Sequence, residues 1–232
     1  MDHVPPAAAE AIPGLIAAID ARDGVTARHG AEVGRLARAV ALELGWTARD
    51  AAGALVAGLV HDIGRIALPD AVLGAPGRLD AAQWVLMRTH PERGARLLDD
   101  LGVDAQVVAA VRAHHERWDG SGYALGLRAT EIPRMARLVG LCEAHDAMTA
   151  PRPAGRAKPP AVARDELALE AGILFDPEMV EALLDVAAAA PRGPGDFGAA
   201  WRAATGGGSP ATPGADAGDP KRFVPRTQVD QP

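Results

Sequence analysis

The chain has 232 residues, of which 48% are hydrophobic and 23% charged, and its formal net charge is −6. This acidic balance argues against nucleic acid as the main partner, because Lys and Arg side chains that neutralise phosphates dominate duplex binding. A single cysteine cannot form an internal disulfide or a cysteine-rich zinc site. We therefore expect a cytoplasmic protein in which any metal is held by His and carboxylates.

No contact with a membrane is expected. The most apolar run, from Ala51 to Val60, stops at His61-Asp62 and is about half of the ~20 residues needed to cross a bilayer. The first residues contain neither a basic region nor an apolar one, so the sequence predicts no secretion signal.

Helical periodicity runs through most of the chain before residue 191. An apolar stripe from Val33 to Leu44 predicts one helix, and Thr47 with Asp50 resembles a capping box that opens a helix towards Ile66. Asp80 and Asp104 are the expected N-caps of the next two helices. Three later helices are expected from Pro133 towards Thr149, at 165–171 and from Asp176-Pro177 onward. The sequence therefore predicts an all-α bundle.

Composition divides the chain into three parts. Residues 1–20 form a short N-terminal segment, and residues 21–190 form the helical domain. Residues 191–232 contain eight Gly and seven Pro, which is typical of low-complexity sequence. We expect this tail to be mostly disordered, with a short helix at 196–204 as the ordered alternative.

Five of the seven histidines fall in or beside the expected bundle: His29, His61, His90, His114 and His115. Any one of them alone is more often structural than a metal ligand, but together they suggest a metal site. His61-Asp62 follows the most apolar run, where a buried carboxylate needs a partner such as a divalent cation. An adjacent His and Asp can also reach two different ions.

The pair His114-His115 repeats this pattern. Neighbouring side chains on a helix diverge by about 100°, so the two rings suit two metals, or one metal and one substrate group. Histidine and carboxylate ligands without thiolate fit Fe, Mn, Zn, Co or Ni better than Ca or Mg, and spacing does not choose among them.

Four stretches, in this order along the chain, carry a resemblance to a known family: HDIGRIALPD, RTHPERG, HHERWDGSGYALGL and EIPRMARLVGLCEAHDAMTAPRP. From about Ala21 to Val186, roughly 70% of the chain resembles the HD-GYP family of HD phosphohydrolases. The resemblance implies an all-α HD-type bundle with a cluster of two or three metals, usually iron or manganese. It also implies hydrolysis of cyclic di-GMP to pGpG or GMP, with a diguanylate cyclase (GGDEF) or another signalling protein as an expected partner.

The resemblance also implies roles for individual residues. The metal ligands would be His29, His61, Asp62, His90, His114, His115 and Glu143, with Asp62 as a bridging, catalytic carboxylate. Arg65 would be a catalytic residue that stabilises the transition state at the scissile phosphate, Tyr123 would bind the nucleotide, and Arg152 and Arg156 would hold its second phosphate. His3 and His145 are left over and are expected at the surface or behind the ligands.

The chain departs from the family pattern at several positions. Arg65 stands where family members often have Lys, and Ala124 stands where they have the Pro that names the motif. Glu143 replaces the usual Asp, and Ala154 replaces an aromatic residue. Val25 stands where some trinuclear members have Glu, which favours two metals over three.

Two cations would lower the pKa of a bridging water and hold phosphate oxygens as charge builds, so no protein nucleophile is required. The leading hypothesis is therefore a metal-dependent cyclic di-GMP phosphodiesterase. One alternative is a degenerate domain that binds cyclic di-GMP or a partner protein without turnover. Another is a phosphohydrolase of a different cyclic dinucleotide or nucleotide.

Trp118 and Tyr123 are candidates for stacking on guanine, although Trp118 is equally suited to packing the loop onto the bundle. The lone Cys142 is expected to be a core residue.

Overall fold

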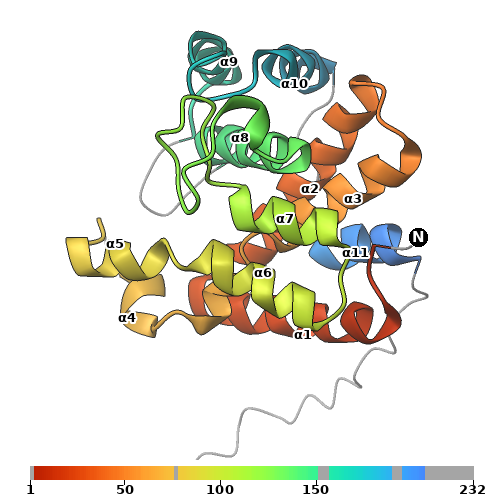
Figure 1. Ribbon diagram of the computed structural model, residues 1–232, viewed down its shortest axis with the longest axis vertical. Helices are drawn as coiled ribbons and strands as arrows, with labels where there is room; N and C mark the ends of the chain where they lie inside the picture. Colours follow the sequence, from red (N-terminus) through yellow and green to blue (C-terminus); the bar gives the residue numbers. More distant parts are fainter. Residues whose placement is uncertain (1–2, 76–77, 151–156, 190–194, 207–232) are drawn as a thin grey trace, which may run out of the picture.

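The computed structural model describes residues 3–75, 78–150, 157–189 and 195–206 (Figure 1). These residues form helices joined by loops and contain one isolated β-bridge, which confirms the all-α prediction for the described chain. The α-helices are α1 (Pro6–Asp23), α2 (Thr26–Glu43), α3 (Ala48–Val60), α4 (Asp70–Leu73), α5 (Ala81–Met87), α6 (His90–Asp100), α7 (Ala105–Ala113), α8 (Arg134–Thr149), α9 (Pro160–Leu169), α10 (Pro177–Ala189) and α11 (Phe197–Thr205). Two short 3-10 helices, η1 (Ile63–Ala67) and η2 (Ala129–Glu131), complete them.

The centre of the bundle is the pair α2 and α3, whose backbones approach closely at glycines. A Cβ added at Gly58 would lie 2.5 Å from Gly34 Cα, and one at Gly30 would lie 2.7 Å from Leu59 O. Every residue of α3 from Gly53 to Val60 is buried. The apolar run that the sequence singled out is therefore the core helix of the domain.

Side-chain caps start three of the helices as predicted. The Thr47 hydroxyl accepts a hydrogen bond from Asp50 N at 3.1 Å, Asp80 accepts from Gln83 N at 2.8 Å, and Asp104 accepts from Gln106 N at 2.8 Å. Each cap satisfies one of the N–H groups that a helix start leaves unpaired.

The helix that was expected to run towards Ile66 ends earlier, at Val60. The chain turns at His61-Asp62 and continues as η1, which packs against α6. Gly64 allows this contact, since a Cβ there would lie 2.0 Å from the carbonyl oxygen of His90. The break brings the HD pair next to the start of α6.

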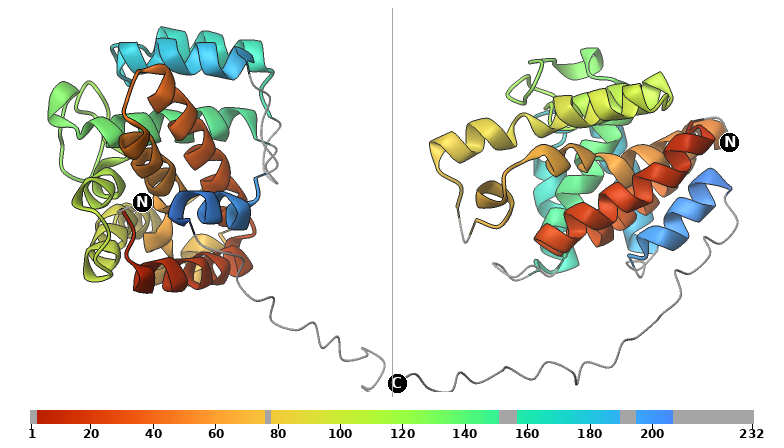
Figure 2. Two further views of the ribbon diagram at one scale, coloured as in Figure 1. Left: turned by 90° about the vertical axis from the view of Figure 1, so that its right-hand side faces the viewer. Right: turned by 90° about the horizontal axis from the view of Figure 1, so that it is seen from below.

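The other helices surround the central pair (Figures 1 and 2). Helix α8 packs on α2 and α7, and α9 and α10 lie against its outer side, while α1 covers α2 and η1 at the opposite end. Helices α4 and α5 project from the body of the domain, and α5 has no buried residue. No helix in the described segments combines the length and apolarity needed to cross a bilayer.

Both ends of the described chain pack onto the bundle. Ile12, Ile16 and Ile19 of α1 are buried, so most of the segment 1–20 belongs to the packed domain. The Gly/Pro-rich region that begins at residue 191 contains α11. A short helix therefore forms where the sequence offered one, at 196–204, as the alternative to disorder. Trp201 of this helix donates a hydrogen bond to Ala9 O at 3.1 Å. The rest of the region 191–232 lies outside the described residues, apart from Gly195, Asp196 and Gly206 beside α11.

Candidate metal centre

The predicted ligands come from five parts of the chain that meet in the middle of the bundle. His29 lies on α2, His61 and Asp62 directly follow α3, and His90 is the first residue of α6. His114 and His115 directly follow α7, and Glu143 lies on α8. Helix ends supply most of these side chains, because there the chain leaves the core and the residues can converge.

The ligand atoms form two groups. One group contains His29, His61 and Glu143, and the other contains His90, His114 and His115; within each group the atoms lie within 4.8 Å of one another. These two groups contain six of the seven predicted ligands, drawn from helices that are distant in sequence.

Asp62 lies between the two groups. Its Oδ2 is 3.4 Å from His61 Nε2, and its Oδ1 is 3.2 Å from His90 Nε2. One carboxylate therefore faces both groups, which is the placement expected of a bridging ligand.

Backbone carbonyls orient three of the imidazole rings in the same way. Nδ1 lies 2.8 Å from Gly58 O in His61, 2.7 Å from Met87 O in His90 and 2.6 Å from Val111 O in His114. Each carbonyl belongs to the residue three positions earlier. Since a carbonyl only accepts, Nδ1 carries the hydrogen, and in the neutral ring Nε2 keeps its lone pair, which is the form that binds a metal.

His29 is oriented by a carboxylate instead. Its Nδ1 lies 2.6 Å from Asp146 Oδ2, and Asp146 is fully buried. No sequence motif assigned this role to Asp146. The available signal was its spacing, because Asp146 lies three residues after Glu143 and therefore on the same side of α8.

The buried polar atoms of this centre fit a cation. His61 and Asp62 are at most 2% exposed, yet His61 Nε2 and both Asp62 carboxylate oxygens have no hydrogen-bond partner. Arg65 Nε lies 2.9 Å from Asp62 Oδ1, in contact but without hydrogen-bond geometry. A buried carboxylate without such partners is costly, and a divalent ion would satisfy it.

Charge also favours a cation here. Burial alone would lower the pKa of His61, but the Asp62 carboxylate outweighs it and raises this pKa to about 9. Burial lowers the pKa of His115 to about 4 and holds that of His114 well below its usual value. The buried carboxylates thus stabilise a positive charge nearby. The rings of His114 and His115 stay neutral and are available as metal ligands.

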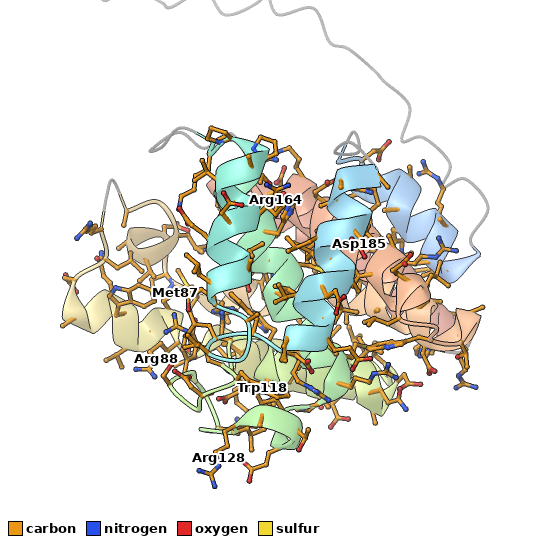
Figure 3. The ribbon with its side chains drawn as sticks, turned by 90° about the horizontal axis from the view of Figure 1, so that it is seen from above. Met87, Arg88, Trp118, Arg128, Arg164 and Asp185 are labelled. Atoms are coloured by element: carbon orange, nitrogen blue, oxygen red, sulfur yellow. The ribbon has the colours of Figure 1, made fainter. Side chains whose placement is uncertain are left out.

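The predicted substrate-binding residues line the rim of this centre where the structure describes them. The Tyr123 ring stacks on His115 with centroids 4.7 Å apart, and the Arg88 guanidinium lies over the same ring at 4.7 Å. Figure 3 labels Arg88 and its neighbour Met87. No pattern in the sequence indicated a role for Arg88. Arg152 and Arg156 lie outside the described residues.

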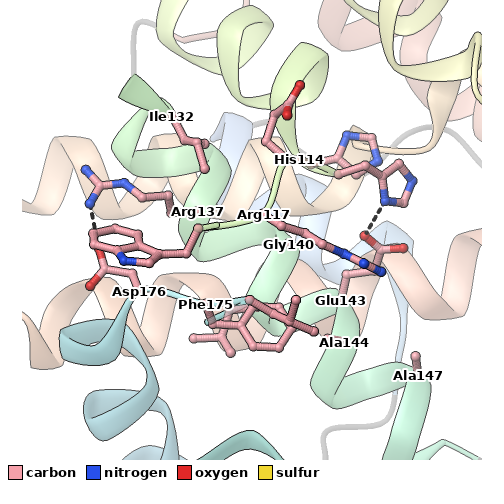
Figure 4. A pocket seen from close by; sticks show the side chains of 15 residues that line it. His114, Arg117, Ile132, Arg137, Gly140, Glu143, Ala144, Ala147, Phe175 and Asp176 are labelled. Atoms are coloured by element: carbon pink, nitrogen blue, oxygen red, sulfur yellow. Dashed lines mark hydrogen bonds and ion pairs between the residues drawn. The ribbon is translucent and has the colours of Figure 1, made fainter. Parts of the chain in front are cut away.

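A cavity of about 160 Å³ adjoins the centre. It extends from His115 and Glu143, whose Nδ1 and Oε2 atoms lie 3.6 Å apart, towards Phe175 (Figure 4). Trp118 is half-buried and lines the cavity, with the Arg137 guanidinium 5.6 Å from the centre of its ring. Its backbone N–H donates a hydrogen bond to Leu174 O. These contacts match the packing role considered for Trp118.

The two remaining histidines lie apart from the centre. The expectation of a surface or supporting position is wrong for His3, which is 4% exposed. Its ring contacts Asp104 Oδ2 at 3.1 Å and Arg49 O at 2.9 Å, so it fastens the N-terminus to α3 and α7. His145 is partly buried and lines a separate cavity with Glu32 and Arg35.

An all-α bundle that gathers five histidines and two carboxylates around one buried point defines the metal-dependent HD class of domain. The family model for the HD domain matches residues 14–179, and the chain belongs to this family. Membership implies a divalent-metal site, for which the two ligand groups are suited. The resemblance to HD-GYP proteins is also confirmed by relatives and by the fold.

Two relatives and one solved structure illustrate the similarity. A cyclic di-GMP phosphodiesterase of Thermotoga maritima is 38% identical over 165 residues, covering 70% of this chain and 45% of the relative. A 3′3′-cGAMP-specific phosphodiesterase 2 of Vibrio cholerae is 34% identical over 180 residues, which cover 76% of this chain and 34% of the relative. An HDG"Y"P protein of Bdellovibrio bacteriovorus matches with a TM-score of 0.57 at 23% identity, over 70% of this chain and 52% of that one. The chain thus spans less than half the length of these two curated relatives.

Proposed function

We propose that this chain is a metal-dependent phosphodiesterase that hydrolyses cyclic di-GMP to pGpG or GMP. The observation that carries the proposal is the pair of ligand groups that face one shared carboxylate, Asp62. The names of the relatives support the substrate, since several are cyclic di-GMP phosphodiesterases.

Two divalent cations, iron or manganese, would be held by His29, His61, Asp62, His90, His114, His115 and Glu143. When bound, they supply an acidified water and positive charge for the phosphate oxygens. The carbonyls that accept from Nδ1 hold three of these rings in a fixed orientation. Asp62 faces both groups and so fixes the distance between them.

Arg65 and Tyr123 act on the substrate side. Arg65 is held beside Asp62 and presents a planar guanidinium that suits two phosphate oxygens at once. Burial raises the pKa of Tyr123, so its hydroxyl stays protonated and can donate a hydrogen bond. Arg152 and Arg156 would assist from the segment after α8.

The departures from the family pattern are compatible with turnover. Glu143 reaches the same group as His29 and His61 despite its extra methylene, and Tyr123 stays at the centre although Ala124 follows it. We further propose that the protein acts in signal transduction in the cytoplasm, as its lone cysteine suggests, with a diguanylate cyclase or another signalling protein as partner.

The test combines metal analysis with a product assay. Protein prepared without oxygen and loaded with Fe or Mn should contain two metals per chain and release pGpG or GMP from cyclic di-GMP. His61→Ala should lose both metal and product. A fully loaded protein that leaves the dinucleotide intact would refute the proposed activity.

Relatives named for 3′3′-cGAMP make that dinucleotide the second candidate substrate. The same assay run with both dinucleotides separates them. A kcat/KM for 3′3′-cGAMP at least tenfold above that for cyclic di-GMP would assign the chain to the second substrate.

A further inference from the structure

A cationic side chain enters the cavity beside the proposed metal centre. Arg117 follows His115 by two residues and lines the cavity that also contains His115 and Glu143. Figure 4 shows its side chain running across the cavity towards Glu143. The residue is exposed, so a ligand arriving from solvent can reach its guanidinium.

Neighbouring arginines are already engaged. Arg65 contacts Asp62 at 2.9 Å, Arg137 pairs with Asp176 at 2.5 Å, and Arg88 lies over the Tyr123 ring. Among the described residues, no hydrogen bond or ion pair is found for the Arg117 side chain. Its charge contributes, after the Ser121 N–H, to lowering the pKa of the exposed Asp119.

The backbone that presents Arg117 is tightly fixed. Its carbonyl accepts from Gly120 N at 2.8 Å, and the next residue, Trp118, donates to Leu174 O at 2.9 Å. Gly122 packs directly on this turn, because a Cβ there would lie 2.5 Å from Arg117 N. Little backbone ordering would therefore accompany binding, which favours affinity.

The proposed substrate contains an anionic group that the Arg117 guanidinium can bind. A cyclic dinucleotide carries two phosphodiesters, of which the metal centre can engage only the one being cleaved. The second remains an anion that must be matched as the ring settles into the site, and a guanidinium forms paired hydrogen bonds to phosphate. We propose that Arg117 binds the non-scissile phosphate and so positions the substrate. This inference rests on the proposed function, because it concerns the same substrate.

The variants Arg117→Ala and Arg117→Lys test it, with Arg128→Ala as the matched control. Arg128 is an exposed arginine of the same loop that projects away from the body of the domain (Figure 3). Each metal-loaded protein is assayed with cyclic di-GMP and with bis(p-nitrophenyl) phosphate, which has one phosphate. Calorimetry measures the Kd for cyclic di-GMP separately from turnover.

Loss of a charge-assisted hydrogen bond should raise both KM and Kd for cyclic di-GMP about 10- to 100-fold in Arg117→Ala. Arg117→Lys should recover part of this loss. In Arg117→Ala, metal content and the rate with bis(p-nitrophenyl) phosphate should stay within about twofold of wild type. The substitution removes binding energy that the dinucleotide has equally in the ground state and the transition state. Arg128→Ala should resemble wild type throughout.

Other outcomes separate the two proposals. A wild-type-like Kd in Arg117→Ala would overturn the inference alone. A variant that loses metal or the single-phosphate reaction would also overturn it, because Arg117 would then act through Glu143. If wild type binds cyclic di-GMP without cleaving it, the proposed activity fails, while weaker binding by Arg117→Ala still supports the phosphate contact. A wild type that neither binds nor cleaves it overturns both.

Discussion

At the scale of single residues, hydrogen bonds behind the ligands determine what the centre can hold. In His61, His90 and His114, Nδ1 forms a hydrogen bond with a backbone carbonyl, and in His29 it forms one with the Asp146 carboxylate. A carboxylate behind a histidine fixes the ring and makes its other nitrogen a stronger ligand. Asp146 is therefore as much part of the centre as the residues that face it.

We expect Asp146→Asn to reduce metal affinity or activity about 10- to 100-fold, the usual effect of removing such a supporting carboxylate. Metal titration and the product assay measure it. Asp185→Asn, at an exposed aspartate of α10 labelled in Figure 3, is the control and should leave both unchanged. Equal values for the two variants would show that His29 does not need this partner.

Cys142 lies fully buried one residue before Glu143. Burial raises the pKa of its thiol, so the reactive thiolate is scarce at neutral pH. We expect no labelling by a thiol reagent in the folded protein and labelling of this one cysteine in denaturant. Rapid labelling under native conditions would contradict the packing described for α8.

At the scale of elements, glycines set how closely the helices that carry ligands can approach. Gly34 and Gly58 let α2 meet α3, which places His29 near His61. Gly64 lets η1 meet α6, and Gly140 lets α8 pass the carbonyl of His114, where a Cβ would lie 2.3 Å away. Each contact lies close to a proposed ligand, so an added methyl group should displace the ligand as well as the helix.

Gly34→Ala should lower the free energy of unfolding by about 1–3 kcal/mol, because its Cβ would lie 2.7 Å from Leu55 O. Gly14→Ala is the matched control within α1, where nothing lies within 4 Å of the new atom. That variant should gain about 0.5–1 kcal/mol from helix propensity alone. Urea unfolding of both proteins measures the difference, and effects of the same sign would contradict the close approach of α2 and α3.

At the scale of the whole molecule, the two ends of the described chain cover the helices that hold the centre. Helix α1 packs on α2 and η1, and α11 packs on α2 and α3. Phe197 and Trp201 stack with centroids 5.8 Å apart, and Trp201 is 4% exposed. The family match ends at residue 179, before α11 begins.

Trp201→Ala should lower the free energy of unfolding by about 3 kcal/mol, at the lower end of values for buried aromatic residues, because a terminal helix can detach without unfolding the rest. Metal content should be retained, since no proposed ligand lies on α11. Urea unfolding and metal analysis test these expectations. An unchanged stability would mean that α11 contributes little to the fold.

Metal binding should stabilise the whole domain. Mn²⁺ at a hundred times its Kd should add about 2.7 kcal/mol and raise the Tm, because the unfolded chain lacks the assembled centre. EDTA should reverse the rise. Asp62→Asn should show a much smaller shift, and thermal unfolding with and without Mn²⁺ measures all three. An equal shift in wild type and Asp62→Asn would place the ion elsewhere.

Although the helix expected to reach Ile66 ends at Val60, the sequence alone predicted the all-α class and the side-chain caps, because periodicity and capping act over a few residues. Thr47, Asp80 and Asp104 cap as predicted for this reason. It also determined which residues are candidate ligands, since histidine and carboxylate chemistry and the ordered motifs are properties of the chain itself.

How these residues meet follows from the tertiary structure. The split into two groups facing Asp62 depends on close backbone contacts between helices that are distant in sequence. The same is true of Asp146 behind His29, separated by 117 positions, of Arg88 over Tyr123 and of the buried His3. Local patterns do not encode such contacts, because they depend on the packing of the whole bundle.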